Sequence, residues 1–145
     1  MLGARSAEHL IFADELAAFS ELLVCTDDGS AGRHGLVTDA LEALLATRQV
    51  DVVYAAGPVP MMRAVAAVTA PGAVRTIVSL NPIMVDGTGM CGGCRVTVGG
   101  TMRFACVDGP EFDAHGVDFD ELVDRLTIYR EAEHTARDHA CRGPA

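Results

Sequence analysis

The sequence predicts an α/β fold, in which a parallel sheet with flanking helices is followed by a small cysteine-rich subdomain and a C-terminal helix. Two observations lead to this expectation. Short apolar runs alternate with helical patterns between residues 22 and 80, and a stretch rich in glycine and cysteine follows at residues 86–106. We expect three parts, formed by residues 1–80, 81–117 and 118–145.

A surface helix is expected over about residues 7–19, where apolar residues recur between acidic ones. Helical periodicity predicts a second helix over Val37–Leu45, and the prolines at positions 58 and 60 predict the start of a third. Short apolar runs bounded by turn residues predict buried strands at Glu21–Asp27, Val50–Ala55 and Val74–Leu80. Strands and helices in this alternation form one parallel sheet that is covered on both faces.

Two glycine-bearing loops, Asp27–Gly35 and Ala56–Met61, follow predicted strands and are expected at the same edge of the sheet. Ligands of parallel sheets bind at the carboxyl ends of the strands, so a nucleotide is the expected guest. Neither loop has the G-x-G-x-x-G pattern, and tight turns alone would also explain the glycines.

Residues 86–106 contain four potential ligands at the spacing Asp-x4-Cys-x2-Cys-x11-Cys, namely Asp86, Cys91, Cys94 and Cys106. Plant-type two-iron clusters use Cys-x4-Cys-x2-Cys with a distant fourth cysteine, so a carboxylate replaces the first thiolate here. The spacing favours an iron-sulfur cluster. A structural zinc, bound by the three cysteines with Asp86 or His115, is the alternative. Asp-Gly is also an ordinary turn pair.

Gly99-Gly100 separates two short strands, at residues 95–98 and 101–105, and is typical of a two-residue hairpin turn. This hairpin is expected to bring Cys94 and Cys106 together. A polar loop is expected over residues 107–117. Asp118 is predicted to cap a final helix with Glu121 as its capping-box partner. A frayed tail is expected from His134 onward.

The other two cysteines are interpreted differently: Cys25 as a small buried hydrophobe within a strand, and Cys141 as a non-ligand in the tail. Three of the five cysteines fall at metal-ligand spacing, which favours a metal or cluster in a reducing compartment over a disulfide framework. A net charge of −9 argues against nucleic-acid binding. No apolar run suits a membrane span and no secretory leader is evident, so a cytoplasmic location is expected.

Four stretches together carry a resemblance to a known family: NPIMVDGTGMCGGCRVTVGG, FACVDGPEFDAHGVDFDEL, DDGSAGRHGLVTDAL and AAGPVPMMRAV. They closely resemble the C-terminal part of the FAD/NAD-binding small (alpha) subunit of NADH-dependent reduced ferredoxin:NADP oxidoreductase, also known as the sulfide dehydrogenase small subunit. The electron-transfer subunit of dihydroorotate dehydrogenase B is a more distant relative. The resemblance extends to about Glu133.

The resemblance implies that residues 1–80 are the C-terminal portion of a ferredoxin-reductase-like NAD(P)-binding domain and that residues 81–117 are a [2Fe-2S]-binding subdomain. The implied cluster ligands are Asp86, Cys91, Cys94 and Cys106. The implied NAD(P)-binding residues are Asp27, Asp28, Gly29, Ser30, Gly32, Gly57, Pro58, Val59, Pro60 and Met61. An aspartate at the first ligand position is similar to the ferredoxin:NADP branch, whereas the dihydroorotate branch uses a fourth cysteine.

The function implied is that of an oxidoreductase subunit, or a fragment of one, which passes electrons between NAD(P)H, FAD and the cluster. A larger flavin and iron-sulfur subunit and ferredoxin are the implied partners. The family's FAD-binding barrel has no counterpart in this sequence, so FAD is expected only in the full-length family member. No residue has the pattern of a general acid, base or nucleophile. Two other hypotheses remain: a zinc- or cluster-binding docking module without enzyme activity, and a nucleotide-binding regulator with an incidental metal.

Overall fold

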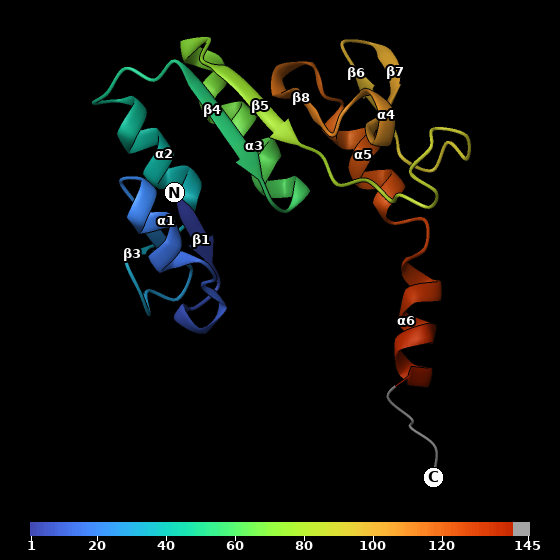
Figure 1. Cartoon of the computed structure of the whole chain (residues 1–145), viewed down its shortest axis with the longest axis horizontal. Coiled ribbons are helices and arrows are strands. Elements are labelled where there is room, and N and C mark those ends of the chain that lie inside the picture. Colours follow the sequence, from blue (N-terminus) through green and yellow to red (C-terminus); the bar gives the residue numbers. More distant parts are fainter. Residues whose placement is uncertain (141–145) are drawn as a thin grey trace. The chain divides into compact units, whose positions relative to one another are not determined.

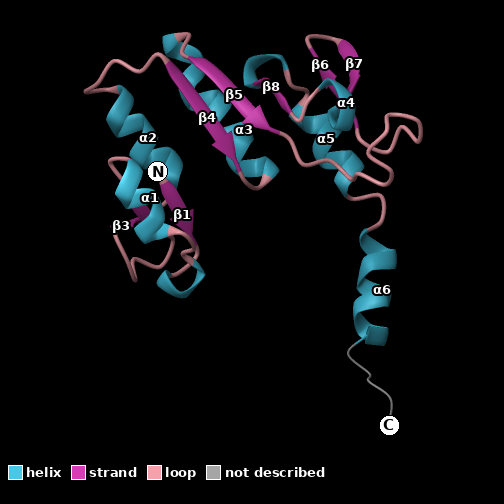
Figure 2. Ribbon diagram, in the orientation of Figure 1, coloured by secondary structure: helices cyan, strands magenta, loops and turns pink. Residues whose placement is uncertain are grey.

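The structure is a computed structural model that describes the backbone of residues 1–140 and the side chains of residues 1–137 (Figure 1). Internal contacts divide the chain into two units, Met1–Asp51 and Val52–Ala145, and each unit is described by itself. Both units mix helices with strands (Figure 2), so the predicted α/β class is confirmed. The division at residues 80 and 117 stays a prediction.

A short parallel sheet forms the centre of the first unit, with the strand order β1-β2-β3. The middle strand β2 carries two buried side chains, Cys25 and Thr26, and Cys25 is only 1% exposed, as expected for a small core residue. The elements of this unit are β1 (Leu2–Ala4), the 3-10 turn η1 (Ala7–His9), α1 (Ala13–Phe19), β2 (Val24–Thr26), β3 (Arg33–His34) and α2 (Val37–Leu45).

The helix expected over residues 7–19 is divided in the structure, and the prediction of one continuous helix was wrong. Leu10 has an extended backbone and Phe12 has a left-handed one, with φ of 57°. Such angles interrupt the hydrogen-bond ladder of a helix. No glycine or proline marks this break, so the apolar pattern alone suggested continuity.

The second unit contains another three-stranded sheet, formed by β4 (Val52–Ala56), β5 (Arg75–Ser79) and β8 (Glu111–Asp113) in the order β4-β5-β8. Strands β4 and β5 are parallel, as predicted, and β8 joins β5 as an antiparallel strand. The expected single sheet was wrong. The structure has two three-stranded sheets instead, β1-β2-β3 in the first unit and β4-β5-β8 in the second.

Helix α3 (Val59–Thr69) carries much of the core of the second unit, and it is followed by the 3-10 turn η2 (Ala70–Gly72). Met62 of α3 and Val78 of β5 are completely buried in this core. Strand β4 differs from the buried strand that was predicted, because Tyr54 is 65% exposed and Val52 37% exposed. As the terminal strand of its sheet, β4 presents these apolar side chains to solvent.

The expected hairpin forms from β6 (Arg95–Val98) and β7 (Thr101–Phe104), with Gly99 and Gly100 at φ of 59° and 73°. Positive φ at both positions is what a type I′ turn requires, and glycine adopts it without strain. The short helix α4 (Ala105–Asp108) follows β7 directly.

The expected polar loop at 107–117 was partly wrong, because it contains β8 and the 3-10 turn η3 (Ala114–Gly116). Asp118 caps helix α5 (Phe119–Leu126) as predicted, because its carboxylate accepts a hydrogen bond from the Glu121 backbone N–H at 2.9 Å. The expected capping box is incomplete, because the Asp118 N–H has a partner other than the Glu121 side chain. The N–H of Asp118 donates to the Thr97 carbonyl at 2.9 Å, which ties the start of the helix to β6.

Helix α6 (Arg130–Ala140) replaces most of the frayed tail that was expected from residue 134. Its only apolar residues are three alanines, so it lacks the large apolar side chains that mark a helix in a sequence, but arginine, glutamate and alanine favour helix. Cys141 lies outside the described residues. None of the helices in the described part of the chain has the length and apolar character needed to cross a bilayer.

Candidate metal centre

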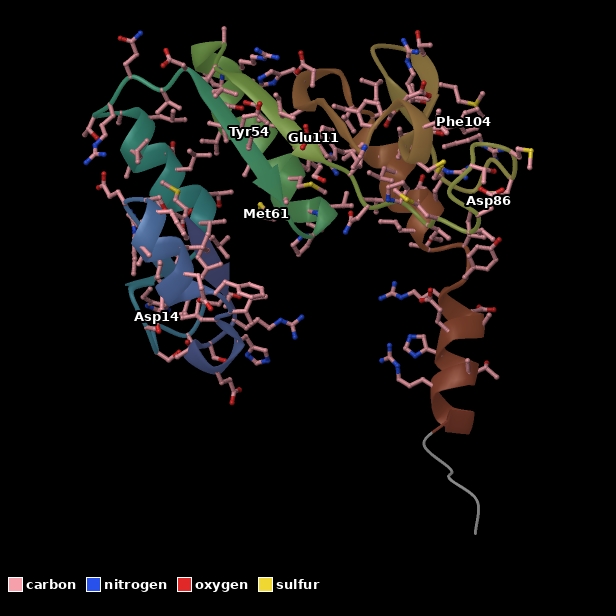
Figure 3. All side chains as sticks on the ribbon, in the orientation of Figure 1. Asp14, Tyr54, Met61, Asp86, Phe104 and Glu111 are labelled. Carbon is pink, nitrogen blue, oxygen red and sulfur yellow. The ribbon has the colours of Figure 1, made fainter. Side chains whose placement is uncertain are left out.

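A glycine-rich segment, residues 81–94, connects β5 to β6 and carries three of the four predicted ligands. Gly89 has φ of 82°, and a side chain there would lie 2.7 Å from a methyl group of Val107. Gly92 is buried at φ of 66°. Glycine at these positions therefore allows the segment to turn sharply and to lie close to the start of α4. The labelled Asp86 and Phe104 mark this end of the second unit in Figure 3.

The Asp86 carboxylate closes the segment on itself. Its Oδ1 accepts a hydrogen bond from the Thr88 N–H at 2.9 Å, and its Oδ2 accepts one from the Cys91 N–H at 3.1 Å. The backbone hydrogen bond from Thr88, with those of Cys91, holds the pKa of Asp86 below its usual value. Asp86 is thus an exposed, ionised oxygen donor next to the backbone of Cys91.

Cys94 and Cys106 are brought together by the hairpin, as predicted. Their sulfur atoms lie 3.2 Å apart, and the Ala105 N–H donates to the Cys94 carbonyl at 3.1 Å. Cys94 immediately precedes β6, whereas Cys106 lies in the first turn of α4, just after β7. Because β6 and β7 are antiparallel, the start of one strand and the end of the other lie side by side.

The two thiols have pKa values shifted in opposite directions. Burial alone would raise the pKa of Cys94, but the hydrogen bonds that it receives from Cys106 and Ala105 lower it below its usual value. The hydrogen bond to Cys94 raises the pKa of Cys106, and the negative charges of Cys94 and Asp86 act in the same direction. Cys94 is therefore the more acidic thiol of the pair.

Cys91 is exposed, and its sulfur accepts a hydrogen bond from the Gly93 N–H at 3.4 Å. His115, the alternative zinc ligand, has its Nε2 atom 3.0 Å from the Val74 carbonyl, beside the beginning of β5. Within the part of the chain whose side chains are described, no three His, Cys, Asp or Glu residues are grouped tightly enough to hold one metal ion. The four predicted ligands instead lie in two pairs, Cys94 with Cys106 and Asp86 with Cys91.

Pairs of ligands suit a two-iron cluster, because each of its irons takes two ligands from the protein. Cys94 and Cys106 are adjacent soft donors that match one iron. The Asp86 carboxylate and the Cys91 residue to which it is hydrogen-bonded lie in the same turn and match the other. The donor set of one carboxylate and three sulfurs therefore fits such a cluster chemically.

The first predicted nucleotide segment, Asp27–Gly32, lies in the first unit as a tightly bonded turn. The Asp28 carboxylate accepts hydrogen bonds from the Ser30 hydroxyl at 2.6 Å and from the Ser30 N–H at 2.9 Å, and these bonds lower the pKa of Asp28. Gly32 has φ of 63°, and a side chain there would overlap the Val24 carbonyl. These contacts explain the glycine as a feature of a tight turn.

The second predicted nucleotide segment, Gly57–Met61, lies in the second unit at the start of α3. Its two prolines are exposed, and the Met62 N–H donates to the Pro58 carbonyl at 3.1 Å. Val59 is 3% exposed because its side chain belongs to the core. Any contact with a ligand there would come from the backbone or from the neighbouring residues.

Sequence reasoning missed two arginines beside the cysteine segment. Arg95 and Arg125 line a cavity of about 230 Å³ together with Cys91, Gly92 and Gly93. The Arg125 guanidinium donates from Nη2 to the Gly93 carbonyl at 3.1 Å. Arg95 follows Cys94 directly in sequence, but Arg125 comes from α5, and no local pattern connects it with the cysteines.

Comparisons with known proteins agree with this chemistry. Residues 81–118 match the family described as the iron-sulfur cluster binding domain of dihydroorotate dehydrogenase B. The chain is 54% identical over 133 residues to a Thermotoga maritima protein named as a homologue of the electron transfer subunit of dihydroorotate dehydrogenase B (NAD(+)), covering 92% of this chain and 47% of that protein. It is 40% identical over 117 residues to the electron transfer subunit from Bacillus caldolyticus, covering 79% of this chain and 44% of that subunit.

A solved structure of an NADH-dependent reduced ferredoxin-NADP oxidoreductase, studied for flavin-based electron bifurcation, is also similar. The match has 49% identity and a TM-score of 0.87, and it covers 97% of this chain and 51% of that one. The chain thus spans about half the length of the relatives it matches, and these relatives are subunits of oxidoreductases. Over about half of their length, the electron-transfer subunits of dihydroorotate dehydrogenase B are thus similar to this chain, and residues 81–118 match the iron-sulfur cluster binding domain of that family.

Proposed function

We propose that this chain is an electron-transfer subunit, or part of one, and that Asp86, Cys91, Cys94 and Cys106 hold a [2Fe-2S] cluster. The observation that carries the proposal is the 3.2 Å approach of the Cys94 and Cys106 sulfurs inside the segment that matches an iron-sulfur domain. A two-iron cluster would supply a one-electron relay.

The residues of the chain have separate roles in this proposal. The hairpin holds Cys94 and Cys106 as a preformed pair of ligands for one iron. Asp86, already ionised, orients the turn that carries Cys91 through its hydrogen bond to the Cys91 backbone. The glycines at 89 and 92 let the segment fold closely around the site. An oxygen donor in place of a fourth thiolate also changes the charge distribution, which is one of the factors that tune the potential.

NAD(P) is the proposed nucleotide, with Asp27–Gly32 and Gly57–Met61 as the segments that contribute to its binding. The resemblance supports this proposal, as does the NAD(+) in the names of the relatives. FAD binding is proposed only for a protein that includes the other half of the relatives' length. A larger flavin and iron-sulfur subunit is the proposed partner, with ferredoxin as a further electron carrier and the cytoplasm as the location.

Metal analysis of the full chain tests the proposal. Protein purified without oxygen is expected to contain iron and acid-labile sulfide in equal amounts and to absorb visible light. A colourless protein with stoichiometric zinc would contradict the cluster and favour the zinc-binding docking module. Cys94→Ser should lower the cluster content and Cys25→Ser should not, because only Cys94 is a proposed ligand. Cys25→Ser is thus the control for a general effect of losing a thiol.

Dihydroorotate dehydrogenase is the second candidate for the whole assembly, favoured by the family matched at residues 81–118 and by the names of several relatives. The two candidates differ in the electron donor and acceptor. Reduction of the cluster by dihydroorotate, through a dihydroorotate-oxidising partner subunit, would favour this reading. Reduction by NADPH or ferredoxin, without any response to dihydroorotate, would favour the ferredoxin:NADP reading.

A further inference from the structure

Two positive charges lie against the turn that separates Cys91 from Cys94. Arg95 and Arg125 line the same cavity as Cys91, Gly92 and Gly93. Among the described side chains, two close ion pairs between a carboxylate and an arginine form, Glu21 with Arg48 and Asp120 with Arg63, and the Glu8 carboxylate lies 3.8 Å from His9. Neither cavity arginine belongs to these pairs, so no carboxylate in the described part of the chain neutralises them at close range.

Arg125 is connected to the cysteine segment by a chain of hydrogen bonds. Its guanidinium donates to the Gly93 carbonyl at 3.1 Å, and the Gly93 N–H donates to the Cys91 sulfur at 3.4 Å. Arg125 is half-buried, so water screens its charge less than that of an exposed side chain. Arg95 is exposed, but its Nη1 would lie 3.1 Å from a side chain built at Gly92, so it also lies along this turn.

The site that these arginines face would be anionic. Four anionic ligands outweigh the positive charge of a two-iron, two-sulfide core, and reduction by one electron adds a further negative charge. A nearby cation stabilises the reduced state more than the oxidised state, because its attraction grows with the charge that it faces. The chain as a whole has a net charge of −9, which would otherwise oppose reduction.

We infer that Arg95 and Arg125 raise the reduction potential of the cluster held by the cysteine segment, and that Arg125 also positions the Cys91–Cys94 turn through the Gly93 carbonyl. This inference rests on the proposed function. It concerns residues that are not ligands, and it gives the two arginines that line the cavity a role in setting the reduction potential of the cluster.

The test is a redox titration of the full chain, followed by EPR, in five forms: the parent, Arg125→Met, Arg125→Lys, Arg95→Met and Arg75→Met. Arg75 is an exposed arginine of the same unit at the start of β5, at the opposite end of that strand from the cysteine segment. Loss of Arg125 is expected to lower the equilibrium constant for one-electron reduction about tenfold, which lowers the reduction potential by about 59 mV. Arg125→Lys should recover most of this shift, Arg95→Met should move the potential less but in the same direction, and Arg75→Met should leave it unchanged.

Two results would overturn the inference by itself. The first is that Arg125→Met and Arg95→Met both have the same reduction potential as the control Arg75→Met. Another is a shift in Arg125→Met that Arg125→Lys does not recover, because the effect would then come from the shape of the turn and not from charge. If Arg125→Met does not bind a cluster, the reduction potential of Arg95→Met alone tests the inference. A parent protein without any cluster overturns the proposed function together with the inference, whereas a normal cluster with unaltered potentials overturns the inference alone.

Discussion

The Asp86 carboxylate accepts backbone hydrogen bonds from Thr88 and Cys91, one on each of its oxygen atoms, and an iron ion would need one of these two oxygens as its ligand. In the structure these bonds explain Asp86 fully as a turn residue. In the proposed cluster, one oxygen would ligate while the other keeps the bond to the Cys91 backbone. Asp86 can therefore act both as a turn residue and as a ligand. The cluster content of a variant without the carboxylate shows whether it is a ligand.

Asp86→Ala is expected to lower the iron and sulfide content strongly, because one iron would lose its oxygen ligand and the turn would lose two hydrogen bonds. Asp86→Cys should keep the cluster with a changed EPR spectrum, since four thiolates are the common ligand set. Asp124→Ala is the matched control, an exposed aspartate of α5. Full cluster content with an unaltered spectrum in Asp86→Ala would show that Asp86 is only a turn residue.

At the scale of elements, the hairpin and α5 determine where the ligands and the arginines lie. The β6–β7 register brings the two ends that carry Cys94 and Cys106 together. Asp118, the N-cap of helix α5, donates its N–H to the Thr97 carbonyl of β6, and about two turns later the helix places Arg125 against the Gly93 carbonyl. The hairpin depends on its glycine turn and α5 depends on its N-cap, and each feature can be removed by a single substitution.

Gly99→Ala is expected to destabilise the protein by about 1–2 kcal/mol, because alanine pays that cost at a left-handed φ. No atom lies within 4 Å of the added methyl group, so the effect would come from the backbone alone. Gly72→Ala is the control, since its φ is outside the left-handed region and the new methyl group meets Val74 at an ordinary 3.4 Å. Urea unfolding measures both variants, and equal stabilities would contradict the strain argument.

Asp118→Ala removes the side chain that caps α5 at 2.9 Å and is expected to cost about 1 kcal/mol of stability. Because α5 carries Arg125, hydrogen exchange in the helix and in residues 91–94 should accelerate together. Asp124→Ala, which removes an exposed carboxylate near the end of the same helix, should not destabilise it. Faster exchange in α5 without any change at residues 91–94 would indicate that the helix and the turn are not coupled.

At the scale of the whole molecule, the sequence predicted the features that depend on local chemistry. The Gly99-Gly100 turn, the Asp118 cap, the periodic helix α2 and the proximity of Cys94 and Cys106 were all correct. Strands β1, β3 and β8 have two or three residues each, too few for an alternating pattern to appear. Arg125 was missed because its partner, Gly93, is distant in sequence and only the packing of α5 brings them together.

The sheet arrangement was not predictable from the strands alone, because pairing depends on which edges are free. In the structure β2 pairs with β1 and β3, and β5 pairs with β4 and β8, and the sequence did not reveal the short strands β1, β3 and β8. Helix α6 was missed for a different reason. Its residues have the propensity for helix, but alanine is their only apolar type, and a periodic pattern of large apolar residues is the main signal by which a helix is recognised in a sequence.

Glu21 and Arg48 form an exposed ion pair in the first unit, with a nitrogen–oxygen distance of 2.8 Å, and its effect depends on pH. The hydrogen bond from Arg48, together with its charge, lowers the pKa of Glu21 below the usual 4.5. A carboxyl group with a lowered pKa stabilises the folded state above its unfolded pKa, and this contribution is lost as the pH falls through the folded value. Because both side chains are exposed, the effect should be small.

Glu21→Gln should therefore lower the Tm slightly at pH 7, and the difference from the parent should shrink as the pH falls below 4.5. Thermal unfolding followed by circular dichroism at several pH values measures this. A difference that stays constant down to the lowest pH would mean that the effect of the substitution does not depend on the charge of Glu21.

The most direct test of the central claim is the EPR spectrum of the full chain after anaerobic purification and reduction with dithionite, combined with iron, sulfide and zinc analysis. A [2Fe-2S] cluster held by Asp86, Cys91, Cys94 and Cys106 predicts a paramagnetic signal in the reduced protein, with equal iron and sulfide, and predicts that Cys94→Ser loses it while Cys25→Ser retains it. A protein that contains stoichiometric zinc and gives no signal would contradict the account.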